Sequence, residues 1–414
     1  MLIRLLAAPL SLALLAASPA PKVAKLDARE IHGSSLVVDT HADTTQRFLD
    51  EQLDFAKNTP IAEGHMDLAK IRQGNLGAEF FSIWVDPSRH TRFAHRALQL
   101  IDSVYEQARK HPDQMAMAFS SADILAARQG ENKKLAALMG VEGGHAIEND
   151  LGILRDFHRL GVRYMTLTWS NTNEWADSSG DINKNIPHHN GLTEFGKQVV
   201  REMNRLGMMV DVSHVSDKTF YDTLSVARAP VIASHSSARA LTNSPRNMTN
   251  EMLKAVAKNN GVVMVNFFSG FIDESYRKAF NAQTPARNAA IDQLMARLKD
   301  ADPAIQYREH DRVQKQWAAR IPRPPFKSLI DHIDHIAKVA GVDHVGLGSD
   351  FDGVSSLPEG LDSVADLPKI TEALAERGYS KEALQKILGG NLMRTFQECE
   401  RVSDELRREA PSSR

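Results

Sequence analysis

Three polar residues close the first strongly apolar stretch of the chain, at intervals of two. The stretch is VVDTHADTT, residues 37–45, and it contains Asp39, His41 and Asp43. Side chains of a β-strand alternate between its two faces, so these three are expected to point to the same side. Two carboxylates and an imidazole gathered at one place are groups that bind metal ions or move protons.

Four further apolar stretches end in residues of the same kinds, at Glu142, His214, His235 and Asp350. One histidine at a strand end is more often a structural residue, but several would share one pocket if their strands were parallel neighbours. Histidine and carboxylate ligands without thiolate suit Zn²⁺. Because one tetrahedral ion needs fewer ligands, two metal ions about 3.5–4 Å apart are expected, bridged by a carboxylate and a water. The expected reaction is hydrolysis by a metal-bridged hydroxide.

The elements that would hold these residues alternate between strand and helix. Eight stretches rich in β-formers are predicted strands: 35–41, 78–85, 136–144, 163–169, 208–214, 230–236, 262–268 and 344–350. This alternation predicts an α/β fold of the (β/α)8 TIM-like barrel type, in which all strand ends meet on the catalytic face. A doubly wound sheet is the alternative, but no G-x-G-x-x-G motif follows the first strand.

Two segments depart from the alternation. Residues 86–135 are predicted to be a long helical excursion, and residues 269–326 a polar insertion with a proline-rich end. An insertion after a barrel strand would lie over the mouth of the barrel, as a lid or as a solvated helical hairpin. The rest of 21–414 is predicted to be a single catalytic barrel domain.

The N-terminus has the pattern of a secretory signal. Residues 1–20 carry Arg4, an apolar run over 5–17 and small residues that favour cleavage after Ala17 or Ala20. The run is shorter than the ~20 residues that span a bilayer. An uncleaved anchor is the alternative. A periplasmic or secreted protein is expected, without an internal disulfide, because Cys399 is the only cysteine.

Composition narrows the classes of partner. The chain has 414 residues, 42% apolar and 25% charged, which is typical of a globular protein with a full core. Its formal net charge of −2, without a dense cluster of lysine and arginine, excludes nucleic acid or an anionic membrane surface as the expected partner.

Long motifs then give a family resemblance. They are DTHAD, GVEGGHAIENDLGILRDFHRLGVRYMTLTW, NGLTEFGKQVVREMNRLGMMVDVSHVSDKTF, APVIASHSSARALTNSPRNM and HVGLGSDFDGV. In this order, from about Leu36 to Phe396, they resemble the membrane dipeptidase (renal dipeptidase) family. The resemblance implies a zinc-dependent barrel related to the amidohydrolases that cleaves dipeptides at a binuclear site, often as a homodimer.

The resemblance also implies a role for individual residues. Five are the implied metal ligands: His41 and Asp43 for the first zinc, Glu142 as the bridge, and His214 and His235 for the second. Asp350 corresponds to the proton shuttle between the bridging water and the leaving amine. Arg246, in SPRNM, corresponds to the arginine that binds the free carboxylate of the substrate.

One position departs from the family pattern. Where the family has the motif TLTH, this chain has TLTW, with Trp169 in place of the histidine that stabilises the oxyanion. An indole has one N–H donor and no charge, so we expect Trp169 to change substrate choice while the metals supply most of the stabilisation. The alternative is a binuclear amidohydrolase acting on N-acyl amino acids, a β-lactam or a lactone. A non-catalytic binding protein is the third hypothesis.

Other metal-like motifs are expected to lie outside the metal site. They are GHMDL (64–68) at the start of a helix, DHIDH (331–335) with its charges on a solvated helix face, and PHHNG (187–191) in a loop. His145, Asp39 and Asp352 are candidates for supporting a ligand or a strand end without binding metal.

Overall fold

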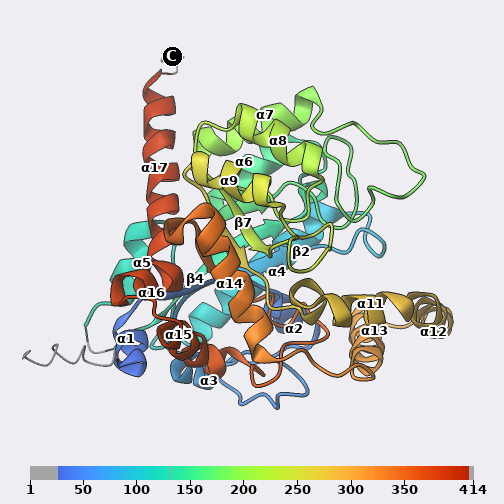
Figure 1. The fold of residues 1–414 in the computed structure, drawn as a ribbon. Coiled ribbons are helices and arrows are strands. Elements are labelled where there is room, and N and C mark those ends of the chain that lie inside the picture. Colours follow the sequence, from blue (N-terminus) through green and yellow to red (C-terminus); the bar gives the residue numbers. More distant parts are fainter. Residues whose placement is uncertain (1–26, 131, 410–414) are drawn as a thin grey trace, which may run out of the picture.

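Eight parallel strands form a nearly closed barrel in the computed structural model, which describes residues 27–130 and 132–409 (Figure 1). In spatial order they are β1 (Val37–Ala42), β2 (Leu76–Trp84), β4 (Leu135–Glu142), β5 (Val162–Thr166), β6 (Met209–Asp211), β7 (Val231–Ser236), β8 (Val262–Val265) and β9 (Val345–Leu347). Ala42 makes a parallel bridge with Phe351, just after β9, which brings the last strand back to the first. Since the strands follow sequence order around the barrel, the predicted (β/α)8 fold is confirmed and the doubly wound alternative is wrong.

Helices surround the barrel and connect its strands. They are α1 (Ala28–Ser34), α2 (Thr44–Asp50), α3 (Leu68–Gln73), α4 (Phe93–Lys110), α5 (Ser121–Ala127), α6 (Leu151–Arg159), α7 (Glu194–Leu206), α8 (Asp217–Val226), α9 (Asn250–Lys258), α14 (Phe326–Ala340), α15 (Leu367–Glu376), α16 (Lys381–Gln385) and α17 (Asn391–Glu409). Local signals set several ends. Thr193 caps α7 by accepting from the amide of Gly196, and Gly207 ends this helix with a φ of 80°.

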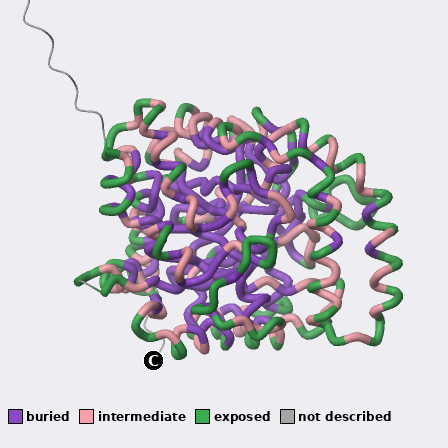
Figure 2. The backbone as a smooth tube through the Cα atoms, turned by 90° about the horizontal axis from the view of Figure 1, so that it is seen from below, coloured by how far each residue is buried: buried purple, intermediate pink, exposed green. Residues whose placement is uncertain are grey.

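Two apolar clusters hold the barrel together, and buried residues concentrate at its centre (Figure 2). The larger cluster joins the outer faces of the strands to the helices. The smaller one contains alternate strand residues together with one face of α17, including Val38, Ala78, Phe80, Leu138, Tyr164, Ile232, Met264 and Phe396. Side chains alternate along each strand, so those that point inward fill the barrel interior, and those on the same side at the strand ends point into the mouth of the barrel.

The two segments that depart from the strand–helix alternation agree to different degrees with the structure predicted for them. The 86–135 segment contains α4 and α5 but also a short strand, β3 (Met115–Met117), which pairs with β4, so the all-helical expectation was incomplete. Residues 269–326 form α10 (Ser269–Ile272), α11 (Glu274–Ala282), α12 (Thr284–Arg297) and α13 (Pro303–Ala318). In Figure 1, α11–α13 project from one side of the barrel, and α12 packs against α13. Movement of this insertion as a lid stays a prediction.

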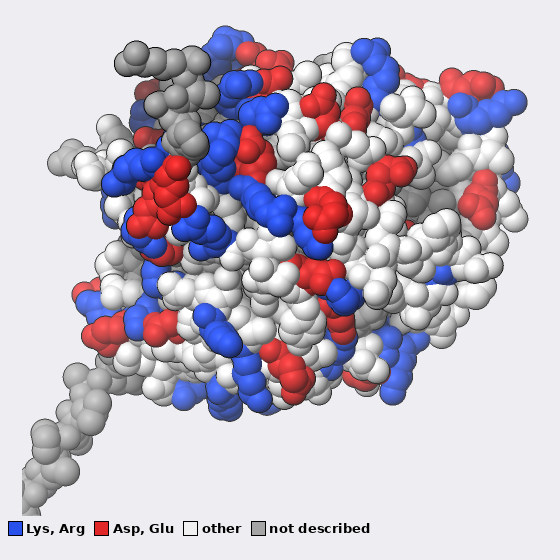
Figure 3. All heavy atoms as spheres, turned by 90° about the horizontal axis from the view of Figure 1, so that it is seen from above, with Lys and Arg blue, Asp and Glu red and all other residues white. Residues whose placement is uncertain are grey.

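Lysine and arginine are interspersed with aspartate and glutamate over the face shown in Figure 3. Among the residues that the structure describes, no helix combines the length and the apolarity needed to cross a bilayer. The predicted signal peptide, residues 1–20, lies outside the described part of the chain.

Candidate metal centre and active site

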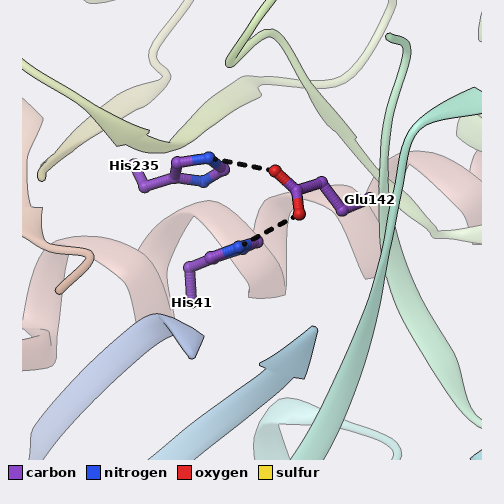
Figure 4. Close-up of side chains that lie close together, drawn as sticks. All are labelled: His41, Glu142 and His235. Carbon is purple, nitrogen blue, oxygen red and sulfur yellow. Dashed lines mark ion pairs between the residues drawn. The ribbon is translucent and has the colours of Figure 1, made fainter. Parts of the chain in front are cut away.

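The five predicted metal ligands converge at the carboxyl ends of the strands. His41 and His235 lie within β1 and β7, Glu142 is the last residue of β4, and Asp43 and His214 follow β1 and β6. The imidazoles of His41 and His235 are stacked, with ring centroids 3.8 Å apart, and the carboxylate of Glu142 lies beside the pair with one oxygen toward each ring (Figure 4). The structure therefore brings together residues that are up to 194 positions apart in the sequence.

The two oxygens of Glu142 face two different groups of donors. Its Oε2 lies 3.5 Å from Nε2 of His41, which is itself 3.6 Å from Oδ2 of Asp43. Its Oε1 lies 2.9 Å from Nε2 of His214 and 3.4 Å from Nε2 of His235. A carboxylate that presents one oxygen to each of two groups has the arrangement needed to bridge two metal ions.

Buried polar atoms of these side chains are placed to bind a metal ion rather than to form hydrogen bonds with one another. Nε2 of His41 and Oδ1 of Asp43 are buried without a hydrogen bond within the described chain. A Cβ atom on Gly353 would lie 2.0 Å from Oδ2 of Asp43 and 2.5 Å from Oδ1 of Asp350. Only a glycine at this position therefore leaves free space in front of these two carboxylates. The donor set of imidazole and carboxylate, without thiolate, is suitable for zinc.

A tyrosine hydroxyl determines which nitrogen of His41 is free. Nδ1 of His41 lies 2.8 Å from the hydroxyl of Tyr164, which donates to the carbonyl of Thr40 at 3.1 Å. Because that hydroxyl donates its hydrogen to Thr40, it accepts from Nδ1–H of His41, and in the neutral imidazole the lone pair is therefore on Nε2, which faces Glu142. Gly140 provides the room, because a Cβ atom there would lie 1.9 Å from the tyrosine ring.

A second chain of hydrogen bonds orients His235 in the same way. Nδ1 of His235 lies 2.7 Å from Oγ of Ser234, and this hydroxyl donates to Oδ2 of Asp211 at 2.6 Å. The carboxylate of Asp211 also accepts from the amides of Ser213 and Ser234. Ser234 therefore accepts from Nδ1–H, and Nε2 of His235 presents its lone pair to the pocket.

Electrostatics favour the metal-binding protonation states of Glu142, His214 and His235, whereas at His41 the neighbouring Tyr164, Glu142 and Asp43 outweigh burial and raise the pKa of the imidazole well above its ordinary value, so that a metal would displace its Nε2 proton. Burial alone would favour a neutral Glu142, but the imidazoles of His41, His214 and His235 hold the pKa of its carboxyl well below its ordinary value. Burial lowers the pKa of His214 to about 4, helped by the guanidinium of Arg246, and burial lowers the pKa of His235 as well. Both imidazoles are neutral at pH 7, which is the form that coordinates metal.

Asp350 lies beside the first group of donors, with its carboxylate held in place. Its Oδ2 accepts from Nδ2 of Asn266 at 2.8 Å, and the amide of Phe268 donates to the other end of Asn266. Withdrawal from water raises the pKa of Asp350; Asp43 and Glu142 add to this rise, and His41 opposes it. A carboxyl whose pKa is raised toward neutral pH can accept and return a proton.

The backbone at the mouth is held in an uncommon conformation. His214, Asp350 and Asp352 have φ angles of 65°, 63° and 63°, in the left-handed region. For residues other than glycine this region costs on the order of 1 kcal/mol, and it is found mainly where a side chain must be aimed. At His214 and Asp350 it directs an imidazole and a carboxyl into the same cavity.

Arg246 is a buried cation without a carboxylate partner. Its Nη2 donates to the carbonyl of His235 at 3.0 Å, and no ion pair joins it to any acid in the described chain. The ring of Phe271 lies 5.2 Å from its Cζ atom. Burial lowers the pKa of Arg246 to about 10, so it keeps its charge at neutral pH and can bind an anion in the cavity.

Trp169 is part of an aromatic wall and lies next to the metal ligands. Its ring is 4.9 Å from that of Trp84 and 6.3 Å from that of His214, and Tyr307 of α13 extends the wall beyond Trp84. The cavity has a volume of about 480 Å³ and is lined by the barrel mouth and by residues of the 269–326 insertion, among them Phe271, Phe280, Arg287 and Tyr307. It offers a polar end at the metal ligands and an aromatic end below the insertion.

The supporting candidates make structural contacts. Asp39 accepts from the amide of Ser349 at 2.7 Å and so ties β1 to the end of β9. Asp352 accepts from the amide of His65 at 2.7 Å and donates its own amide to Nδ1 of that imidazole at 2.8 Å, which keeps His65 away from the metal ligands. Nε2–H of His145 donates to the carbonyl of Val85 at 2.8 Å.

The motif at 331–335 is only partly the solvated face that its charges predicted. Asp331 and Asp334 pair with Arg377 at 2.7 and 2.8 Å. His332, however, is completely buried, and its Nδ1 accepts from the amide of Ala238 at 3.0 Å. The prediction is wrong for His332, because its spacing from Leu329 and Ile336 places it on the apolar side of α14. In the 187–191 motif, His188 and His189 lie in a loop, as expected.

Several residues of the site were not identified from the sequence. They are Tyr164, Asp211, Ser234, Asn266, Trp84, Arg287 and Tyr307. A signal existed for Asp211 and Asn266, which are polar residues at the ends of apolar strands, like the ligands themselves. Arg287 and Tyr307 lie on helices of the insertion, and their place depends on how those helices pack.

Comparisons with known proteins agree with one another. The model of the membrane dipeptidase family (peptidase family M19) matches residues 26–410. The chain is similar to dipeptidase tcpJ of Claviceps purpurea, with 35% identity over 82% of this chain and 70% of the relative. It is similar to dipeptidase 3 of Homo sapiens, with 34% identity over 85% of this chain, and it spans only 62% of that relative's length.

Two solved structures extend the comparison to the fold. The probable dipeptidase PvdM from Pseudomonas aeruginosa superposes with a TM-score of 0.77 at 27% identity, over 91% of this chain and 98% of the other. A metallo peptidase from Rhodobacter sphaeroides, liganded with a phosphinate mimic of the dipeptide L-Ala-D-Ala, superposes with a TM-score of 0.70 at 25% identity, over 88% of this chain and 99% of the other.

Proposed function

This chain belongs to the membrane dipeptidase family and is a metallo-dipeptidase, and from that premise we propose that it hydrolyses dipeptides with two zinc ions. The observation that carries the proposal is Glu142, whose two carboxylate oxygens face His41 on one side and His214 and His235 on the other. His41, Asp43 and Glu142 would hold one ion, and Glu142, His214 and His235 the other. Bound zinc supplies Lewis acidity, which lowers the pKa of water and polarises a carbonyl.

Asp350 would move the proton in this reaction. Its carboxyl lies in the same cavity as Glu142, and Asn266 holds one of its oxygens at 2.8 Å. It would take a proton from the attacking water and deliver it to the nitrogen of the leaving amine, so that the amine departs neutral. Because its pKa is raised by withdrawal from water, both transfers are possible near neutral pH.

Arg246 would fix the end of the substrate. An unpaired, buried guanidinium favours an anion, and the carboxylate at the C-terminus of a dipeptide matches its forked geometry. The ligand of the Rhodobacter sphaeroides metallo peptidase mimics a dipeptide with a D-residue at this end, which supports including such dipeptides among the substrates to be tested.

The test is a substrate panel with the zinc-loaded protein. We expect cleavage of L,L- or L,D-dipeptides, about two zinc ions per chain by elemental analysis, and a loss of at least a hundredfold in kcat for Asp350→Asn. Asp300→Asn, at a side chain that is 89% exposed, is the matched control and should keep full activity. No cleavage of any dipeptide would overturn the proposal, and undiminished cleavage by Asp350→Asn would remove Asp350 from its role.

The second candidate is a binuclear amidohydrolase of other specificity, favoured by Trp169 in the cavity wall. N-acyl amino acids, a β-lactam and a lactone belong in the same panel. Cleavage of one of these at a kcat/KM above that of every dipeptide would establish the alternative.

We also propose that the protein is exported and forms a homodimer. The N-terminal pattern of residues 1–20 supports export to the periplasm or the medium. Edman sequencing of the exported protein should give a start after Ala17 or Ala20, and light scattering should give twice the chain mass. Retention of the full N-terminus in the cytoplasm would contradict export. A mass equal to that of one chain would contradict the homodimer.

A further inference from the structure

A second buried arginine lines the cavity without an anion. Arg287, on α12, has only 6% of its surface exposed. Its Nη1 donates to the carbonyl of Phe280 at 3.1 Å and its Nη2 to Oγ1 of Thr284 at 3.0 Å, whereas its Nε makes no hydrogen bond within the described chain. Burial of a guanidinium without a carboxylate is unfavourable, so the site as built is suited to an anionic ligand.

Several other arginines of the insertion have acidic partners. Arg277 pairs with Glu274 at 2.6 Å, and Arg312 pairs with Glu309 at 2.8 Å. The acids at the rim of the cavity are also engaged: Asp86 pairs with Arg89 and Asp311 with Lys315. Within the described residues no carboxylate lies within ion-pair distance of Arg287. Arg297, Arg308 and Arg320 of the insertion also lack an ion pair but are exposed to water, so what distinguishes Arg287 in this insertion is burial without a carboxylate.

An aromatic floor connects Arg287 to Arg246. The Cζ atom of Arg246 lies 5.2 Å from the ring of Phe271, and that of Arg287 lies 4.0 Å from the ring of Phe280. Between them, Phe268 is 4.9 Å from Phe271 and 5.6 Å from Phe280. The cavity thus has two cationic ends with an apolar surface between them, which fits a ligand with two carboxylates joined by an aliphatic chain.

We propose that Arg287 is a specificity-determining residue that binds the side-chain carboxylate of a dipeptide with an acidic C-terminal residue. The inference rests on the proposed function, in which Arg246 binds the α-carboxylate of that same residue. The methylene groups of the side chain would lie over the phenylalanine floor. Glutamate suits this floor better than aspartate, because its longer chain carries the second carboxylate further from Arg246.

The test compares two substrates of equal shape. L-Ala-L-Glu and L-Ala-L-Gln differ in charge at the end of the side chain, and we expect the wild-type protein to have a kcat/KM at least about tenfold higher for the glutamate dipeptide. Arg287→Gln should lower kcat/KM for L-Ala-L-Glu by about 10- to 100-fold and leave that for L-Ala-L-Gln within about twofold. Arg287→Lys should be intermediate, since it keeps the charge and loses the fork. Arg297→Gln, at an exposed position of the same helix, is the matched control and should change neither value.

Each outcome decides the matter. An equal loss on both substrates in Arg287→Gln, with a lowered Tm, would mean that the hydrogen bonds to Phe280 and Thr284 are its whole role. Equal kcat/KM for the two substrates in the wild-type protein would overturn the inference even if every variant failed to fold. Equal cleavage of both would leave the dipeptidase function standing, whereas failure to cleave any dipeptide would remove the proposed function itself.

Discussion

Nδ1 of His41 and the hydroxyl of Tyr164 lie 2.8 Å apart, and the hydroxyl donates onward to the carbonyl of Thr40. Tyr164 is completely buried in the barrel interior, on β5, which is separated from β1 by two strands, β2 and β4. The interior of the barrel is therefore connected to the metal ligands above it, and a core residue fixes which nitrogen of His41 faces Glu142.

Replacing Tyr164 by phenylalanine should weaken zinc binding. The variant keeps the ring but leaves Nδ1–H of His41 without its acceptor, so we expect the dissociation constant for zinc to rise about 10- to 100-fold. A titration of the metal-free protein against a competing chelator measures this directly, without reference to activity. Tyr105→Phe removes a hydroxyl that contacts only the carbonyl of Leu160, on the outside of the barrel, and should leave zinc affinity unchanged. Equal affinity in wild-type protein and Tyr164→Phe would contradict the assignment.

The fold could be predicted because its signals are local. Each barrel strand is a short apolar run, and each run is followed by a helical pattern, so the order and number of the strands follow from periodicity. The predicted strands extended beyond the observed ends, as at 163–169 against β5 (Val162–Thr166), because the polar residues after a strand continue its pattern while the backbone turns toward the mouth. β3 was missed because three residues are too few to show a period.

The residues of the site that lie at the ends of strands could be predicted from the sequence, whereas those that reach the site through the packing of other elements could not. His41, Glu142 and His235 follow from their positions, since the ends of parallel strands converge. Tyr164 gave no such signal, because a tyrosine in an apolar strand looks like any core residue until its hydroxyl is found beside His41. Arg287 reaches the cavity only through the arrangement of α11 and α12, which no local pattern specifies.

Removal of the metal should destabilise the protein. Without zinc, the carboxylates of Asp43 and Asp350 lie close together, and the carboxylate of Glu142 lines the same cavity. Zinc at a hundred times its dissociation constant stabilises a folded site by about 2.7 kcal/mol, so treatment with EDTA should lower Tm by roughly 5 °C or more. Scanning calorimetry should show that zinc restores Tm and that Mg²⁺, which prefers oxygen ligands, does not. Glu142→Gln should lose this response to zinc; an unchanged Tm after EDTA in the wild-type protein would contradict two bound ions.

Trp169 should control both rate and substrate choice. If the indole supplies a weaker oxyanion donor than an imidazole, Trp169→His should raise kcat for dipeptides by about 10- to 100-fold. The same change opens the wall that Trp169 forms with Trp84, so the ranking of substrates by kcat/KM should also change. Trp84→His alters the same wall without placing an imidazole at that position, and should change the ranking without the rise in kcat. Unchanged kinetics toward every dipeptide in Trp169→His would rule out both effects.

His332 should make the fold sensitive to acid independently of the metal centre. Burial lowers the pKa of His332 to about 4, against an ordinary value of about 6.5 in the unfolded chain. Between these values the unfolded chain binds a proton that the folded chain does not, so the free energy of unfolding falls as pH decreases from 6.5 to 4, by on the order of 3 kcal/mol. His332→Asn keeps an acceptor for the amide of Ala238 but cannot titrate. Urea denaturation should therefore show a smaller loss of stability between pH 7 and pH 4.5 in this variant than in the wild-type protein. His95→Asn, on the exposed side of α4, should keep the wild-type loss, and equal losses in all three proteins would show that His332 is not the acid-sensitive group.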